Sequence, residues 1–423
     1  MHLVNGTYSD QVPSFNISNS RNYLLLFILW PFLACLTALA NFSQKEARVV
    51  VYMFLIYYGL NFVIPDTGYV DAMGYANELR INASLPFSAF FKILGGLYTE
   101  DSSVDIYEHL ISFIVSRLTT DHRFLFGVFA AVFGYFYLKS INIINGIYRQ
   151  NPNWNSLVHL FFFCVILPIT LINGVRMWTA AWIFFYGAIH VIMDRDKRYL
   201  LVALSSSLVH FSFLSANIVL LIYFFAGNRN LIYLPIAISS FFLPQLLTPI
   251  IKSIGIGLGG SLQARVEGYS NEEWILGVQE HREQNTWFMQ LGNDLVFYYL
   301  IVAIIIIQIV NRNSFKEKAE RNLFSFLLLF ISFVNFGVDI PSFGGRFKLV
   351  FFLFGTVYMI LYFRRRNSSN INLLTLIGIF PMLLYAAVTF RIGSDSINSW
   401  IFAPGLGLPL FTPILSIADL LFN

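Results

Sequence analysis

Long apolar runs separated by short polar breaks make up most of this chain. A helix that crosses the hydrocarbon core of a bilayer needs about 17–25 predominantly apolar residues. Runs of this length lie at residues 22–41, 47–64, 123–143, 155–172, 177–193, 199–226, 293–311, 322–338, 346–363 and 371–390. The pattern therefore predicts a chain built from membrane-spanning helices.

Two further apolar segments, 230–250 and 399–423, are interrupted by prolines. Proline removes a backbone donor and breaks or kinks a helix, so both segments predict broken or re-entrant structure. The interruptions are Pro235, Pro244 and Pro249 in the first segment and Pro404, Pro409 and Pro413 in the second. The predicted fold class is all-α and polytopic, with about 10–12 transmembrane helices and re-entrant segments.

Composition supports this class. Hydrophobic residues make up 57% of the chain and charged residues 12%, with a mean hydropathy of +0.66. In a soluble globule about a quarter of the residues are charged, so a soluble protein is excluded. The polar first twenty residues precede a full-length span, so a cleavable signal peptide is not expected.

Lysine and arginine are concentrated in one set of loops. The loops 42–48, 139–154, 194–198, 311–321 and 364–370 hold 14 basic and 5 acidic residues. Because short basic loops stay in the cytoplasm, the N-terminus is expected outside. The single transmembrane domain, 1–423, then has two long outer loops, 65–121 and 251–292. This topology requires either that 230–250 enters and leaves on one face or that 199–226 is a broken double pass.

Arg176 and Arg346 each lie where an outer loop gives way to an apolar run. Arg176 follows Asn173 and Gly174, and Arg346 follows two glycines. In the predicted topology both begin helices whose free N–H groups and positive dipole ends face outward. A helix N-terminus with a guanidinium favours phosphate, and glycine lets a ligand approach the backbone. The alternative is that both arginines are interface anchors.

His210 is a polar group deep in a predicted span. It lies about eleven residues into the run that starts at Arg198, roughly 16 Å along a helix that rises 1.5 Å per residue. Such a histidine either belongs to a functional site or forms hydrogen bonds that hold helices together. In the second case residues 205–207, all serine, are candidate partners.

An acidic segment follows the second span. If a helix begins near residue 69, then Asp71, Tyr75 and Glu78 share one face, because their spacing is i, i+4 and i+7. A carboxylate there is suited to take a proton from a sugar hydroxyl. Asp71 is therefore the preferred candidate base, and Asp66 and Tyr75 are candidate substrate contacts. The alternative is an acidic, solvated loop.

The second outer loop has the pattern of an amphipathic helix around residues 274–287. Trp274 is a candidate for stacking on a sugar ring, and the stretch 280–283 offers His281 as a base and Arg282 as a phosphate ligand. A solvated helical face explains the same stretch. The spacing of histidine and cysteine indicates no metal site, and the chain has no nucleotide-binding loop or cofactor motif.

Taken in order, these motifs resemble the EpsG-type, Wzy-like polysaccharide polymerases of bacteria. The similarity covers about residues 66–348. It rests on the acidic segment, on the run from Asn173 that opens a span, on the span with His210-Phe-Ser, and on Arg346-Phe-Lys. In the family, glutamine commonly follows the first arginine, whereas this chain has Met177.

The resemblance implies a metal-independent, cofactor-free glycosyltransferase of the GT-C-like helical class in the bacterial inner membrane. Such enzymes join undecaprenyl-diphosphate-linked oligosaccharide repeats at the periplasmic face. The leaving diphosphate would be held by Arg176 and Arg346, and Asp71, or else His210 or His281, would accept the proton of the acceptor hydroxyl.

The expected partners are the lipid-linked substrate, the bilayer, and a chain-length regulator and flippase of the same pathway, but no nucleic acid. A flippase for the same lipid-linked sugar and a membrane acyltransferase are the alternative functions. A flippase needs cations that reach the cytoplasmic side, so the outward clustering of the arginines favours the polymerase.

Overall fold

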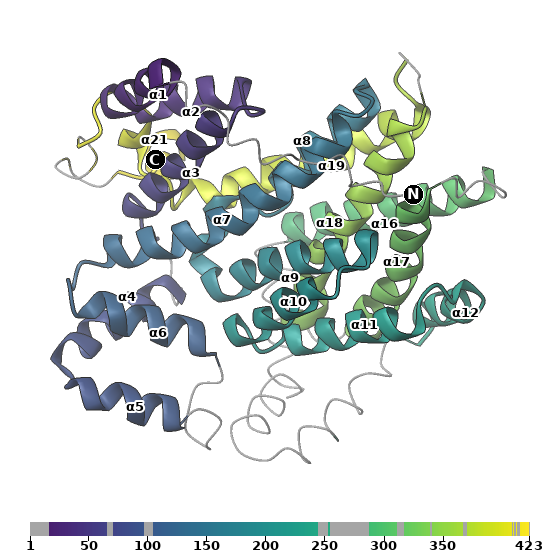
Figure 1. Ribbon diagram of the computed structural model, residues 1–423, viewed down its shortest axis with the longest axis horizontal. Coiled ribbons are helices and arrows are strands. Elements are labelled where there is room, and N and C mark those ends of the chain that lie inside the picture. The colour runs from purple at the N-terminus through teal and green to yellow at the C-terminus, as the bar shows by residue number, and fades with distance from the viewer. Residues whose placement is uncertain are drawn as a thin grey trace.

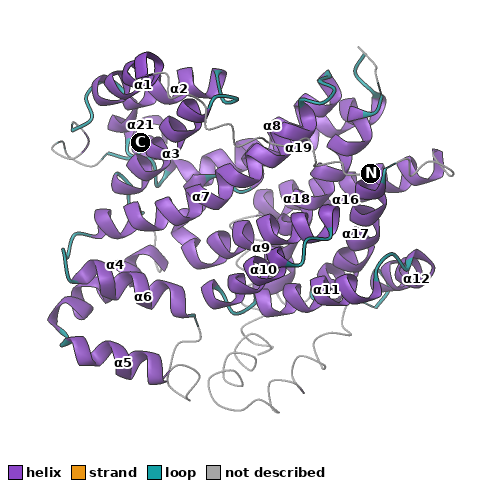
Figure 2. Ribbon diagram, in the orientation of Figure 1, coloured by secondary structure: helices purple, strands orange, loops and turns teal. Residues whose placement is uncertain are grey.

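The computed structural model describes residues 17–65, 71–96, 105–243, 253, 287–310, 317–338, 341–366, 370–407, 409, 412 and 415–422. The regular elements in these ranges are helices, as Figure 2 shows, and two isolated β-bridges join Phe62 to Ile397 and Asn398 to Ser416. The predicted all-α class is confirmed.

The helices follow one another along the chain as labelled in Figure 1. Their bounds are α1 (Ile17–Leu29), α2 (Pro31–Ala40), α3 (Lys45–Leu60), α4 (Asp71–Ser84), α5 (Phe87–Gly96), α6 (Ile106–Ser116), α7 (His122–Tyr148), α8 (Trp154–Ile166), the 3₁₀ helix η1 (Ile169–Gly174), α9 (Val175–Asp194), α10 (Arg198–Val209), α11 (Phe213–Ala226), α12 (Asn230–Ser240), α16 (Trp287–Val310), α17 (Lys318–Phe336), α18 (Pro341–Arg364), α19 (Leu373–Ser394), η3 (Ser399–Phe402) and α21 (Ile417–Phe422).

Six runs of helix in the described residues are long and apolar enough to cross a membrane. They are His122–Tyr148, Trp154–Asp194, Trp287–Val310, Lys318–Phe336, Phe343–Arg364 and Leu373–Ser394. The second run is divided by η1 into α8 and α9, and the chain folds back between them, because Phe163 packs on Trp182 and Phe185 with ring centroids 5.7 and 5.3 Å apart. The chain is thus a multi-pass membrane protein by helix length and composition, as predicted.

The predicted span 199–226 is a helical hairpin. α10 ends because His210 adopts an extended backbone, with φ −147° and ψ 117°, and α11 starts three residues later. The two helices lie antiparallel, since the Asn217 amide donates to the Ser206 hydroxyl at 3.1 Å. Residues 210–212, called the hairpin tip below, therefore return the chain to the end from which it came. A return to the same end agrees with the broken double pass, one of the two alternatives that the loop charges left, but its arms of 12 and 14 residues are shorter than a full span.

The two segments interrupted by proline form short helices in their described residues. The segment 230–250 forms α12, which contains Pro235, and residues 244–250 lie outside the described residues. The C-terminal segment packs over a break in the predicted span 22–41: the Trp30 indole N–H donates to the Phe402 carbonyl at 2.8 Å. This hydrogen bond links the C-terminal segment to the junction of α1 and α2 at a partly exposed position.

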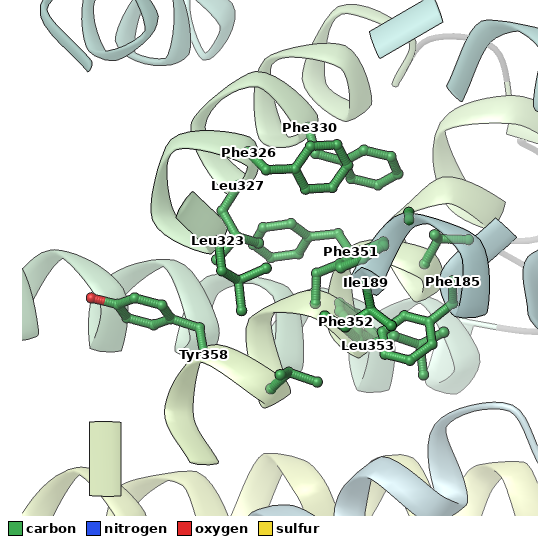
Figure 3. Packing of buried hydrophobic residues seen from close by; sticks show 14 of the residues in the cluster. Phe185, Ile189, Leu323, Phe326, Leu327, Phe330, Phe351, Phe352, Leu353 and Tyr358 are labelled. Atoms are coloured by element: carbon green, nitrogen blue, oxygen red, sulfur yellow. The ribbon is translucent and has the colours of Figure 1, made fainter. Parts of the chain in front are cut away.

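Phenylalanine rings fill the space between α9, α17 and α18. The ring of Phe354 on α18 lies with its centroid 4.9 Å from that of Phe185, 5.0 Å from Phe326 and 5.8 Å from Phe330, and all four side chains are fully buried. Figure 3 shows three of these rings among the aliphatic side chains of the same cluster. This packing holds α9, which carries Arg176, against the centre of the bundle.

α9 and α10 approach each other closely at Gly187. A Cβ atom added to Gly187 would lie 2.4 Å from the backbone nitrogen of Ala203. Real atoms do not tolerate this distance, so the contact requires glycine. The close approach sets the position of the hairpin relative to α9.

The loops rich in lysine and arginine gather at one end of the helices, called the basic end below. There Arg364 contacts Gln150 and Glu317, and the Asn322 amide donates to the Ile192 carbonyl at 2.9 Å. The opposite end, called the α4 end, holds residues 61–65, 71–96, 105–121, 169–176 and 394–398. For example, Val63 N donates to Ser396 O at 3.1 Å. The described parts of the loops fall into the two groups that the topology prediction made, and the side of the membrane that each group faces stays a prediction.

Candidate functional site

The long loop predicted at 65–121 folds into helices α4, α5 and α6 in its described residues, with α4 beside α6 (Figure 1). These two helices run parallel, because Glu78 pairs with His109 and, one turn further along both helices, the Asn82 amide donates to the Ser112 hydroxyl at 3.3 Å. Between them lies a line of polar side chains that we call the α4–α6 seam. Its members are Tyr75, Glu78, Asn82, Asp105, Glu108, His109 and Ser112.

Arg176, the second residue of α9, contacts the seam at Tyr75 and Asp105, which we call the first level of the seam. Its Nε donates to the Tyr75 hydroxyl at 3.2 Å, and its Nη1 donates to Asp105 Oδ2 at 3.1 Å. Burial raises the pKa of Tyr75 although the charge of Arg176 opposes this, so the phenol stays neutral. The Arg176 side chain is 22% exposed. It is therefore directed into the protein and keeps part of its surface open to a ligand.

Asp105 connects Arg176 to the hairpin tip. Its Oδ1 accepts a hydrogen bond from the backbone N–H of Phe211 at 2.7 Å, while Oδ2 faces Arg176, and the side chain is only 4% exposed. Sequence reasoning missed this residue as part of the site. Asp105 directly precedes α6, a position where aspartate is favoured, but a partner that is a backbone N–H leaves no trace in the sequence.

Asn173 fixes the start of α4 relative to the start of α9. Its Oδ1 accepts from Ala72 N at 3.2 Å. Asp71 is the first residue of α4 and is exposed, and its negative charge acts on Tyr75. A Cβ at Gly174 would lie 3.1 Å from the indole nitrogen of Trp178. The Asn-Gly pair before Arg176 thus orders the helix junction around the arginine.

His210 belongs to the hairpin tip and not to the middle of a continuous helix. Its Nδ1 accepts from Ser212 N at 3.2 Å and is hydrogen-bonded to the Ser212 hydroxyl at 2.9 Å. The hydroxyls of Ser205 and Ser206, two of its three predicted partners, donate to carbonyls three residues earlier in α10. His210, which is 8% exposed, shapes the turn that presents Phe211 N to Asp105.

Arg346 lies on the second turn of α18 and not, as predicted, at its start. α18 begins at Pro341, since proline suits the first position of a helix. Gly344 makes room for the end of α17, where a carbonyl oxygen would lie 2.6 Å from an added Cβ, so its role is helix packing. Phe347 packs on Phe213, beside the hairpin tip, with ring centroids 5.2 Å apart. The backbone of α18 beside Arg346 thus lies near the hairpin tip.

Glu78, Glu108 and His109 form the second level of the seam. His109 Nδ1 is hydrogen-bonded to Glu78 Oε1 and lies 3.4 Å from Glu108 Oε2. Burial and the negative charge of Glu78 raise the pKa of Glu108, whose Oε1 meets no donor in the described part of the chain. Glu108 therefore keeps its proton to a higher pH than an ordinary glutamic acid does.

Glu78 and His109, the other two groups of this level, each shift the pKa of the other. Burial alone would raise the pKa of Glu78, but the hydrogen bond and charge of His109 outweigh burial and lower it. Burial alone would lower the pKa of His109, but the hydrogen bond to Glu78 and the nearby carboxyl groups raise it. The protonation states of Glu78, Glu108 and His109 therefore depend on one another, about one helical turn along the seam from Arg176.

These three groups are also the donor set in the described residues that could hold a metal ion. Their oxygen and nitrogen atoms all lie within 4.8 Å of one another. Carboxylate and imidazole are ligands that several divalent cations accept. The sequence spacing indicated no such set because Glu78 comes from a different helix than Glu108 and His109.

Four predicted site residues lie outside the described residues. They are Asp66, Trp274, His281 and Arg282. Of the predicted outer loop 251–292, the residues from Trp287 onward form the start of α16. Asp71, Tyr75, Arg176, His210 and Arg346 are all described.

The fold and this site define an all-helical, multi-pass membrane protein with a buried charged seam at one end. The model of the EpsG family matches residues 86–401, about three quarters of the chain, and the chain belongs to this family. The match includes Asp105, Arg176 and His210 but not α4, whereas the predicted resemblance covered 66–348. Searches of curated proteins and of solved structures give no match.

Proposed function

We propose that this protein is a glycosyltransferase of the bacterial inner membrane that polymerises a surface polysaccharide. It joins oligosaccharide repeats carried on undecaprenyl diphosphate at the periplasmic face. Family membership and a multi-pass fold support an enzyme whose substrates stay in the bilayer. The observation that carries the proposal is Arg176, held in place at a helix N-terminus.

Arg176 suits the leaving diphosphate of the donor. Its planar guanidinium is fixed by Tyr75 and Asp105, so little order is lost when an anion binds to the exposed part. The N-terminal end of α9 adds a positive dipole, and Gly174 supplies no side chain that caps it. When the bond from the sugar to the diphosphate breaks, negative charge develops where these groups can stabilise it.

Arg346 is the second cation proposed for the same diphosphate. Its neighbour in the chain, Phe347, packs on Phe213 beside the hairpin tip. Asp71, exposed at the start of α4, is the base expected from the sequence. No metal or cofactor is invoked in this proposal.

A polysaccharide gel from a strain that lacks this gene tests the proposal. A polymerase mutant should carry a single repeat in place of a ladder of chain lengths. Complete loss of surface polysaccharide would indicate the alternative of a flippase. A normal ladder with altered acyl content would indicate an acyltransferase.

A further inference from the structure

We propose that Glu78, Glu108 and His109 form a binding site for a divalent transition-metal ion, with Zn²⁺ as the ion that suits these donors best. The site joins α4 to α6 at the second level of the seam, about one helical turn from Arg176. It does not depend on the proposed function, because glycosyl transfer as proposed above uses no metal.

The three side chains bring their donor atoms to one place. One oxygen or nitrogen atom of each residue lies within 4.8 Å of the other two. His109 Nδ1 lies 3.4 Å from Glu108 Oε2 and is hydrogen-bonded to Glu78 Oε1. In a tetrahedral zinc site with bonds of about 2.1 Å, neighbouring ligand atoms lie about 3.4 Å apart. Glu108 and His109 therefore already have the separation of two ligands of one ion.

Glu78 completes the set by a small movement of its side chain. Hydrogen-bonded atoms lie closer together than two ligands of one ion, so Glu78 Oε1 has to move away from the imidazole when an ion replaces the proton between them. The Glu78 side chain is 27% exposed and comes from a different helix than His109. Rotation of this side chain can supply the movement without a shift of either helix.

Glu108 carries a buried oxygen that accepts no hydrogen bond. Its side chain is only 3% exposed, and Oε1 meets no donor in the described part of the chain. Leaving such an oxygen without a partner is costly, since buried carboxylates are normally paired, hydrogen-bonded or bound to a metal. The other oxygen of the same carboxyl group faces His109, so Oε1 lies at the donor set. A cation held by the three side chains gives Oε1 a partner.

The charges along the seam favour a divalent ion at the second level. At the first level Asp105 pairs with Arg176 and neutralises its charge, which would otherwise repel a cation. Among the ion pairs of the described residues, the carboxyl groups of Glu78 and Glu108 have His109 as their partner. Two carboxylates balance the charge of a divalent ion, and the imidazole binds it in the neutral form.

The nitrogen donor selects the class of ion. Imidazole suits Zn²⁺ and neighbouring transition metals, whereas Ca²⁺ and Mg²⁺ prefer sites made of oxygen ligands alone. Zinc sites with three protein ligands of mixed nitrogen and oxygen type commonly keep a fourth position for water. A given site of this kind also binds Zn²⁺ more tightly than Mn²⁺. Zn²⁺ with a water as fourth ligand is therefore the expected occupant.

A bound ion would fasten α4 to α6. Glu78 belongs to α4 and the other two ligands belong to α6, and the same two helices are joined one turn further along by the hydrogen bond from Asn82 to Ser112. Tyr75 and Asp105, which hold Arg176, lie on α4 and directly before α6. The ion would therefore also keep the two partners of Arg176 in their relative positions.

The experiment measures Zn²⁺ binding to the full-length protein in detergent, after treatment with EDTA and removal of the chelator. Titration calorimetry with ZnCl₂ should show saturable binding of one ion per chain. Glu108→Gln and His109→Gln should each weaken binding about 100-fold or more, since even groups that only orient a ligand contribute about 10- to 100-fold. The matched control is His190→Gln, because His190 also pairs with a carboxylate, Asp194 at 3.1 Å, but at the basic end. This control should keep the wild-type affinity.

Thermal unfolding supplies a second measurement. Zn²⁺ should raise the Tm of the wild type and of His190→Gln, because an ion that binds the folded chain stabilises it, and Mg²⁺ at the same concentration should not. The Tm of Glu108→Gln and His109→Gln should not respond to Zn²⁺. If one of these variants does not fold, Glu78→Gln takes its place, since the Glu78 side chain is more exposed.

Two results would overturn the metal site: a wild-type protein that binds no Zn²⁺ saturably, or an unchanged affinity in both Glu108→Gln and His109→Gln. Either result leaves the proposed function standing, because chain joining is not part of the measurement. A protein that binds Zn²⁺ as expected but forms no glycosidic bond would refute the proposed function and leave the metal site in place.

Discussion

Asp105→Asn should destabilise the protein far more than its small chemical change indicates. The Asp105 carboxylate is 4% exposed and bridges Arg176 Nη1 at 3.1 Å and Phe211 N at 2.7 Å. Asparagine keeps one acceptor for Phe211 but removes the charge that neutralises Arg176. Losing one partner of a buried ion pair costs about 3–5 kcal/mol.

The loss of stability in Asp105→Asn should be smaller than this range indicates, because the Arg176 side chain is 22% exposed and water solvates part of its charge. We expect a loss of about 2–4 kcal/mol in the free energy of unfolding. For a chain of this size, that corresponds to a fall of about 2–5 °C in Tm. The measurement is thermal unfolding of purified protein in one detergent.

Asp196→Asn is the matched control. Asp196 also pairs with an arginine, Arg198 at 2.8 Å, but this arginine side chain is 87% exposed, so the Tm should not change. The double variant Asp105→Asn, Arg176→Met should lose less stability than the sum of its single variants, because no charge is then left uncompensated. Equal Tm shifts in Asp105→Asn and Asp196→Asn, or strict additivity, would refute the bridging role of Asp105.

Three further predictions concern packing, topology and pH. Gly187→Ala should lower Tm, because the new Cβ would meet Ala203 N at 2.4 Å, whereas Gly74→Ala, with open space around it, should leave Tm unchanged or raise it. Cysteine placed at the exposed Asn77 should react with a membrane-impermeant thiol reagent in intact spheroplasts and cysteine at Lys197 should not; the reverse pattern would invert the predicted topology. Glu108 has a raised pKa, so the stability it contributes in its protonated form is lost as pH rises through that pKa. The Tm of wild type should therefore fall towards alkaline pH more steeply than that of Glu108→Gln, and parallel curves would contradict the assignment.

The helical class and most helix positions are visible in the sequence because the length of an apolar run sets what it can span. α7 and α9 begin and end within a few residues of the predicted limits. The hairpin break at His210 is different, since no proline or glycine marks it. Its turn depends on Asp105, more than a hundred residues away, which accepts from Phe211 N.

The candidate site was predictable only in part. Arg176 and Tyr75 were identified because a cation at a helix start and a polar helix face are local patterns, and the structure joins them directly. Asp105, Glu108 and His109 were missed, because their importance depends on the parallel pairing of α4 with α6. The two glycines before Arg346 were assigned to a ligand, whereas Gly344 serves the contact between α17 and α18.

The most direct test of the central claim is chain joining by purified Arg176→Lys in nanodiscs that contain the lipid-diphosphate-linked repeat. Lysine keeps the charge but cannot reproduce the two-donor plane that Tyr75 and Asp105 hold in place. We predict a rate about 10²- to 10³-fold below wild type, close to that of Arg176→Ala. A wild-type ladder of products from Arg176→Lys would contradict the assignment of Arg176 to the diphosphate.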